Sequence, residues 1–160
     1  MMLSKNFSLK SFVKSNTAIR LGIDNVPTSA HIENMKYLCA KILQPARDNF
    51  GIIDVSSGYR SVKLCEAIGS DKTSFHAIGC AGDSEIRYEK VSNFEYLLWV
   101  YEHCEFTELI AEYFDRNNNE AGWVHSAIQK GRENERTLKL KDSRHNYQIV
   151  TIDYLKKLYQ

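Results

Sequence analysis

The chain has 160 residues, of which 43% are hydrophobic and 26% charged, a composition typical of a globular protein with one core. The formal net charge of +1 excludes the broad positive surface of a dedicated nucleic-acid-binding protein. This length, without an obvious linker, predicts a single domain over residues 1–160, which we expect to be a monomer.

Hydrophobic segments long enough for a signal peptide or a membrane span are not found in the sequence. We therefore expect synthesis in the cytoplasm and no membrane association, so that action outside the cell would need release by another protein. The four cysteines form no Cys-x-x-Cys pair, and we interpret them as reduced, partly buried thiols rather than as metal ligands.

The first part of the chain has helical patterns separated by one loop. Residues 7–13 are predicted to form a short helix, and residues 16–27, which contain turn signals, are predicted to form a loop. Residues 28–49 form the clearest helix, because apolar side chains recur at three- and four-residue spacing after a Thr-Ser pair that can cap it. Pro45 is expected to end or kink that helix.

The rest of the chain alternates between strands and shorter helices. The predicted strands are 52–56, 83–88, 107–114, 122–128, 137–141 and 147–151. The predicted helices are 61–68, 91–104 and 152–159, and residues 70–82 are predicted to form a long loop. An asparagine-rich turn at 115–119 joins two strands into a hairpin, and the last two strands form another. Helices followed by hairpins predict an α+β fold rather than a doubly wound α/β fold.

Three potential metal ligands occur in two short segments. Residues 74–83 contain His76 and Asp83, joined by a glycine-containing loop that lets both turn inward, and residues 122–125 end at His125. A catalytic zinc site commonly has three protein ligands and leaves the fourth position open, so convergence of these residues predicts a hydrolase. Taken alone, each residue is better explained by packing or hydrogen bonding, and the spacing by itself leaves the metal site open.

Two other charged residues are candidates for catalysis. Glu112 shares a strand face with Ile110 and Phe114, where a carboxylate is costly to bury unless it is paired or functional. It is a candidate general base, with a salt bridge as the alternative. Arg60 follows a strand and can bind a carboxylate through two hydrogen bonds, or it can be an ordinary exposed turn residue.

Most of the chain resembles the zinc-dependent D-alanyl-D-alanine carboxypeptidases, a group of peptidoglycan peptidases with short phage and prophage members. The resemblance is strong because several specific segments occur in the right order, and it weakens after residue 130. The segments that carry it are 7–12, 17–25, 42–47, 56–61 (Ser-Ser-Gly-Tyr-Arg-Ser), 74–83 (Ser-x-His-x6-Asp), 109–112 (Leu-Ile-x-Glu) and 122–125 (Gly-Trp-Val-His).

This resemblance implies that His76, Asp83 and His125 bind Zn²⁺, that Arg60 binds the substrate or polarises its carbonyl, and that Ser74 supports the site. The implied fold is a small antiparallel sheet packed against helices, as in Hedgehog-type domains. The implied reaction is hydrolysis of a peptide bond in the peptidoglycan stem peptide, by a carboxypeptidase or an endopeptidase. A phage-encoded lytic enzyme, released by a partner pore to act on the cell wall, would fit this picture.

The sequence departs from the family pattern beside the expected metal site. Phe75 stands where glutamine is frequent, so a polar contact can be lost there, and Gly82 replaces a usual alanine. Some relatives carry the catalytic acid three residues before the last zinc histidine, a position that is Gly122 here. Glu112 is then the first candidate for the base, and Glu120 in the connecting loop is the second.

Two other classes of function stay open at this stage, and a third is disfavoured. In the first, the chain is a binding module of the same fold, in which Phe75 and nearby changes abolish turnover while wall peptides or a phage structural protein are still bound. In the second, it is a structural assembly protein whose histidines only pack, and chelation would not change its melting temperature. A cysteine protease would pair Cys80 with a histidine, but it leaves Asp83 and His125 unexplained.

Overall fold

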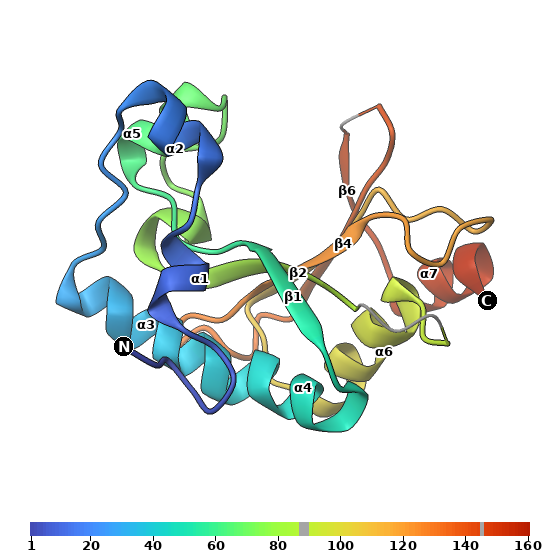
Figure 1. Cartoon of the computed structure of the whole chain (residues 1–160). Helices are drawn as coiled ribbons and strands as arrows, with labels where there is room; N and C mark the ends of the chain where they lie inside the picture. Colours follow the sequence, from blue (N-terminus) through green and yellow to red (C-terminus); the bar gives the residue numbers. More distant parts are fainter. Residues whose placement is uncertain (87–89, 145) are drawn as a thin grey trace.

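One mixed sheet of six strands, in the order β1-β2-β4-β3-β5-β6, runs through the middle of the molecule (Figure 1). The computed structural model describes residues 1–86, 90–144 and 146–160. The strands are β1 Ile53–Ser57, β2 Ala81–Ile86, β3 Glu108–Glu112, β4 Trp123–Ala127, β5 Thr137–Lys141 and β6 Tyr147–Ile149. The predicted α+β class is confirmed.

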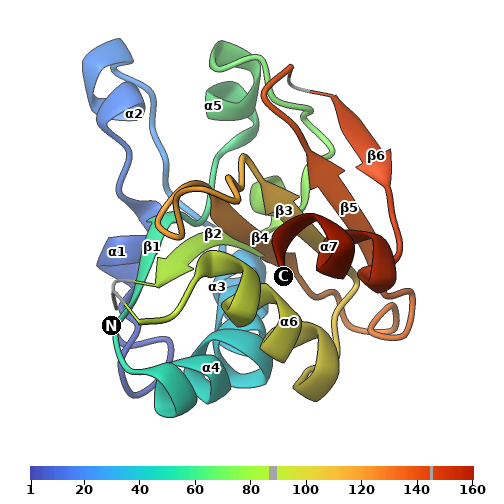
Figure 2. The same cartoon turned by 90° about the vertical axis from the view of Figure 1, so that its right-hand side faces the viewer.

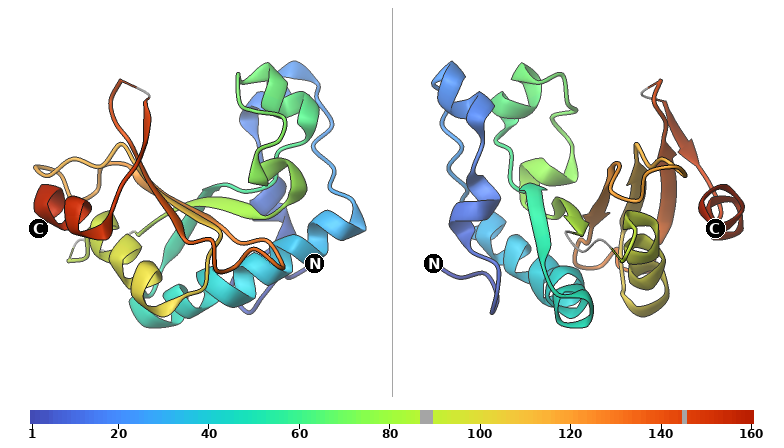
Figure 3. Two further views of the ribbon diagram at one scale, coloured as in Figure 1. Left: turned by 180° about the vertical axis from the view of Figure 1, so that it is seen from behind. Right: turned by 45° about the vertical axis from the view of Figure 1, so that its right-hand side comes forward.

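Helices cover one face of this sheet and leave much of the other face open. The helices are α1 Leu9–Val13, α2 Asn16–Leu21, α3 Ser29–Leu38, α4 Gln44–Phe50, α5 Val62–Ala67, α6 Asn93–His103 and α7 Ile152–Tyr159. Figure 2 shows α3, α4 and α6 below the sheet, with α2 and α5 standing above it. The β5–β6 hairpin rises opposite α2 and α5 (Figure 3), and Tyr147 of this hairpin and Ile68 at the end of α5 line the same cavity. Within the described ranges, no helix combines the length and apolarity needed to cross a membrane.

Alternation along the strands separates the hydrophobic core from the open face. Successive side chains of a strand point to opposite faces, so one set packs toward the helices and the other turns away. The set in the buried core includes Leu109, Ala111, Val124, Leu138 and Leu140. The alternating set lines a cavity and consists of Glu108, Ile110, Glu112, Trp123, His125, Lys139 and Lys141. Polar side chains are therefore concentrated on the face opposite the helices.

The pairing of β3 with β5 is parallel, which corrects the expectation of an antiparallel sheet. β3 and β4 are antiparallel neighbours, and the chain then returns to the other edge of β3 instead of adding β5 beside β4. Two reversals of direction bring β5 back parallel to β3. The pairs β1–β2, β2–β4 and β5–β6 are antiparallel.

The N-terminal region differs from the sequence prediction at α2. Residues 16–27 were expected to form a loop, but Asn16–Leu21 are helical. The Ser15 side chain caps this helix by accepting a hydrogen bond from the Ala18 N–H, and Gly22 ends it in the left-handed conformation at φ 62°. The residues that indicate this helix are therefore the serine before its first turn and the glycine after its last turn, and not the spacing of apolar residues.

The helix predicted at residues 28–49 is observed as helical segments that follow one another from Ser29 to Phe50, and Pro45 does not end it. A π-helical turn at Cys39–Leu43 is separated from Pro45 only by Gln44, and helix α4 continues to Phe50. Proline has no N–H to donate within the helix and its ring collides with the preceding turn, and the wider π turn accommodates both effects. The predicted cap is confirmed at Thr28, whose side chain accepts a hydrogen bond from the His31 N–H.

The region predicted as a loop at 70–82 contains two ordered elements. Phe75–Ile78 form a 3-10 turn, and β2 already begins at Ala81. The strand predicted at 83–88 is thereby observed through Ile86, and residues 87–88 lie outside the described residues. The 3-10 turn carries His76 and β2 carries Asp83, so both candidate ligands of this segment lie in ordered elements.

Gly122 lies against β3 at the end of the asparagine-rich connection. Its φ is +73°, and a Cβ built there would stand 2.1 Å from the backbone oxygen of Glu112. We expect Gly122→Ala to lower the free energy of unfolding, measured by urea denaturation, by about 1–3 kcal/mol from backbone strain alone, and by more from the collision.

The matched control for this variant is Gly131→Ala. Gly131 has φ +85°, but in the described part of the chain no atom lies within 4 Å of the added Cβ. The control therefore measures the left-handed strain without the collision. Equal losses of stability in the two variants would show that the close approach to Glu112 has no energetic weight.

Candidate metal centre

His76, Asp83 and His125 converge on the open face of the sheet. The Nε2 atom of His76 lies 3.2 Å from Oδ1 of Asp83 and 3.2 Å from Nδ1 of His125. The same Nδ1 atom lies 2.8 Å from Oδ1 of Asp83. All three residues are buried, with exposed fractions of 2%, 6% and 5%. The structure therefore brings together the three residues singled out as metal ligands by the sequence.

The backbone explains why these side chains meet. Asp83 on β2 and His125 on β4 are directly paired residues of neighbouring antiparallel strands, so their side chains leave the same face side by side. His76 comes from the 3-10 turn Phe75–Ile78, where the Ser74 side chain accepts a hydrogen bond of 3.3 Å from the His76 N–H. Ser74 thus caps the turn that carries the first histidine.

The outer nitrogen of each histidine shows how the cluster suits a metal ion. Nδ1 of His76 lies 2.6 Å from the Gly58 carbonyl oxygen, which can only accept, so Nδ1 carries the proton and Nε2 is available as a ligand. His125 turns Nδ1 toward the cluster and Nε2 toward Glu108. Metal-binding histidines commonly donate their other ring N–H to a carbonyl or carboxylate. Two imidazole nitrogens and a carboxylate oxygen are a donor set that zinc accepts.

The electrostatics of the cluster are dominated by burial and by Asp83. Burial lowers the pKa of His76 below its ordinary value. Burial alone would raise the pKa of Asp83, but the two histidines outweigh it and hold this pKa well below the usual range. For His125, burial acts downward, yet Asp83 and Glu108 together raise the pKa to about 9. A metal ion would take the place of the proton that His125 otherwise directs at Asp83.

A family comparison agrees with this geometry. The profile of the family described as peptidase M15 matches residues 5–127, which include all three clustered residues. The chain belongs to the peptidase M15 family. A search of curated proteins found no match. Because M15 peptidases are zinc-dependent, membership supports a metallopeptidase, and the His76–Asp83–His125 cluster is the group that could bind its metal.

Arg60 of this M15 family member contacts the cluster directly. Its Nη2 donates to Oδ2 of Asp83 at 2.5 Å, and its Nε donates to the Ser57 hydroxyl at 2.8 Å. Its backbone N–H donates to the His76 carbonyl oxygen at 3.2 Å. The side chain is 18% exposed and therefore largely fixed between these partners. The arginine predicted to bind substrate is thus held beside the expected metal position.

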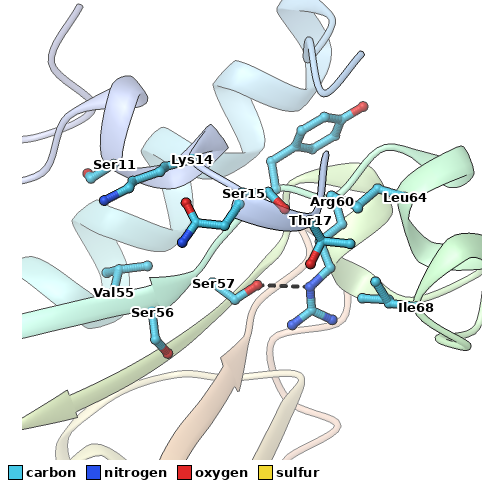
Figure 4. A pocket seen from close by; sticks show the side chains of 12 residues that line it. Ser11, Lys14, Ser15, Thr17, Val55, Ser56, Ser57, Arg60, Leu64 and Ile68 are labelled. Carbon is cyan, nitrogen blue, oxygen red and sulfur yellow. Dashed lines mark hydrogen bonds between the residues drawn. The ribbon is translucent and has the colours of Figure 1, made fainter. Parts of the chain in front are cut away.

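Two cavities meet at Arg60. The larger, of about 810 Å³, contains the cluster, and the smaller, of about 460 Å³, lies between α1, the end of β1 and α5. Figure 4 shows the smaller one, with the Arg60 guanidinium joined to Ser57 by a hydrogen bond. Arg60 and Ile68 line both cavities, so the two form adjoining spaces along one side of the cluster.

The candidate bases lie in different surroundings. Glu112 is 5% exposed and lines the larger cavity, with its Oε2 atom 3.3 Å from the Lys141 ammonium. The salt bridge considered from the sequence therefore exists, and it does not remove Glu112 from the cavity. Glu120 is exposed in the connection between β3 and β4 and is absent from the described lining of this cavity.

Two further residues shape the cavity beside the cluster. Phe75 lines it and lies under the Arg132 guanidinium, whose carbon is 5.4 Å from the ring centre. Glu108 was not selected from the sequence, yet its Oε1 lies 3.5 Å from Nε2 of His125. Burial would raise the pKa of Glu108, but His125 and Lys139 lower it to about 2. The strand alternation that pointed to Glu112 points equally to Glu108.

Proposed function

We propose that the chain hydrolyses a peptide bond of the bacterial peptidoglycan stem peptide, using zinc held by His76, Asp83 and His125. The observation that carries this proposal is the convergence of three buried ligand atoms in a cavity of about 810 Å³. Membership of a zinc peptidase family supports the reaction class. The proposal covers a D-alanyl-D-alanine carboxypeptidase and an endopeptidase, including a phage lytic enzyme that reaches the wall after release.

Zinc at these ligands would supply a Lewis acid and lower the pKa of water toward about 7. Glu112 would accept a proton from the attacking water and return it to the leaving amine. Its burial in the same cavity, on the face that carries His125, supports this role over the exposed Glu120.

Arg60 would stabilise the negative charge that develops on the substrate carbonyl oxygen. A guanidinium has five N–H donors, and the hydrogen bonds described for this side chain use only Nε and Nη2. The remaining donors belong to a largely buried group that Ser57 and Asp83 hold beside the cluster, which is the arrangement that stabilises an oxyanion without costly rearrangement. The adjoining cavity at Arg60 and Ile68 gives a peptide space to extend past the reacting bond.

Purified peptidoglycan of several wall types provides the test. We expect the zinc-loaded protein to release new fragments, detected by mass spectrometry, that are missing from a sample treated with chelator. The masses would identify the cleaved bond and so separate a carboxypeptidase from an endopeptidase.

A lack of new fragments from every wall type would contradict the peptidase. If the protein then co-sedimented with peptidoglycan, the binding module of the same fold would be the better interpretation. The specific observation that favours this second candidate is Phe75, which presents an aromatic ring under Arg132 where a polar side chain is frequent.

A further inference from the structure

We propose that Glu108 is a positioning residue of the metal centre, whose carboxylate accepts the Nε2–H of His125 and so fixes the ring that binds metal through Nδ1. The inference rests on the proposed metal-binding role of His125. It assigns to Glu108 an effect on metal affinity that acts through the histidine, and not a contact with the substrate or the reacting atoms.

The first argument comes from the tautomer that the cluster requires. His125 turns Nδ1 toward Asp83 and His76, so a metal bound there leaves the ring proton on Nε2. That Nε2 atom is buried and makes no hydrogen bond within the described part of the chain. A buried N–H without an acceptor is unfavourable, so the metal-bound ring needs an acceptor on its outer side.

Glu108 is the acceptor that the structure offers at this point. Its Oε1 atom lies 3.5 Å from Nε2 of His125, slightly beyond the usual 2.7–3.2 Å of an N–H···O hydrogen bond. On the strand pair, Ile110 lies directly opposite His125 and Glu108 lies opposite Ala127, so Glu108 is the diagonal neighbour of His125 on the same face. A small approach of the two side chains completes the bond.

A second contact holds Glu108 in place for this purpose. Its Oε2 atom lies 2.5 Å from the Lys139 ammonium, and the side chain is only 15% exposed. The parallel pairing of β3 with β5 puts Lys139 opposite Ile110, again diagonal to Glu108. One carboxylate oxygen is thus anchored by Lys139 while the other remains for His125, so the parallel strand pairing contributes directly to the metal centre.

The position of Glu108 also distinguishes its role from that of a general base. Glu108 faces Nε2 of His125, whereas Asp83 and His76 face Nδ1 on the other side of the imidazole ring. A carboxylate behind the ring acts on the metal only through the ring. Outer carboxylates of this kind orient the ligand and raise its basicity, and their removal commonly weakens metal binding by about 10- to 100-fold.

The test measures zinc affinity, by competition with a chromophoric chelator, and the melting temperature of the metal-free protein. We expect Glu108→Ala to bind zinc about 10- to 100-fold more weakly than the unchanged protein. Glu108→Gln should keep most of the affinity, because its amide oxygen still accepts the Nε2–H. Glu112→Gln is the matched control, since it alters a carboxylate on the same strand and face without touching His125, and it should bind zinc normally.

The outcomes distinguish this inference from the proposed function. If the unchanged protein does not bind zinc, the proposed function fails and the inference fails with it. If the unchanged protein binds zinc and Glu108→Ala binds it equally well, only the inference is overturned. A lower melting temperature of metal-free Glu108→Ala with unchanged zinc affinity would also overturn it, in favour of a purely structural ion pair with Lys139. Glu108→Met, which fills a similar volume, gives the same comparison if the alanine variant does not fold.

Discussion

A His125→Ala variant is expected to lose stoichiometric zinc and zinc-dependent peptidase activity in the same preparation. His125 supplies one of three ligand atoms, and its strand pairing with Asp83 fixes both side chains on one face. Two remaining ligands cannot hold zinc in the three-ligand arrangement of a catalytic site. The loss of zinc affinity should therefore be larger than the roughly 10- to 100-fold loss that is typical when a residue hydrogen-bonded to a metal ligand is removed. Metal analysis and release of peptidoglycan fragments measure the two losses.

His103→Ala is the matched control for this variant. His103 lies at the exposed end of α6, where its ring stacks on Trp99, away from the cluster. Its replacement should leave zinc content and activity unchanged. If His125→Ala kept stoichiometric zinc, the cluster would not be the metal site, and if it lost zinc but kept full activity, the peptidase would not depend on that metal.

Local signals predicted most of the secondary structure but not its arrangement. Turn signals such as the asparagine-rich segment 115–119 separated the strands, and capping residues such as Thr28 identified helix starts. The parallel partner of β3 was not predictable, because the position of a strand in a sheet depends on contacts far apart in sequence. Helix α2 was missed because it is short and largely exposed, so its formation depends on Ser15 and Gly22 more than on an apolar stripe.

The sequence was sufficient to predict the ligands of the candidate site, but not the contacts that support these ligands. His76, Asp83 and His125 stand in recognisable segments, and the cross-strand pairing of the last two explains their convergence. The connection of Glu108 to His125 becomes visible only when the register of β3 on β4 is known. A charged residue on an alternating strand has several possible neighbours, and only the fold selects one of them.

The register also relates the two acidic residues of β3 to two lysines. Glu108 is paired with Lys139 and Glu112 with Lys141, so both of these carboxylates have a cation from β5. Burial of a carboxylate without a partner would be costly, and these pairs make two acids tolerable near a third, Asp83. The parallel β3–β5 pairing therefore allows two largely buried carboxylates, Glu108 and Glu112, to lie beside the proposed zinc ligands.

A Glu112→Gln variant is expected to keep zinc and lose most of its turnover. The amide has nearly the same shape as the carboxylate but cannot accept the proton of the attacking water, and general base catalysis commonly contributes about 10²- to 10⁴-fold. The loss should appear in kcat, measured by fragment release, while zinc content stays stoichiometric. Because Gln also leaves the Lys141 ammonium without its carboxylate partner, the melting temperature must be compared as well.

Glu120→Gln distinguishes the two candidate bases with the same chemical change. Glu120 is exposed in the β3–β4 connection, so its replacement should leave kcat unchanged unless this loop moves into the cavity during the reaction. A fully active Glu112→Gln protein would refute the assigned base, and loss of turnover in Glu120→Gln alone would transfer the role to that residue. Loss in neither variant would exclude both Glu112 and Glu120 as the base.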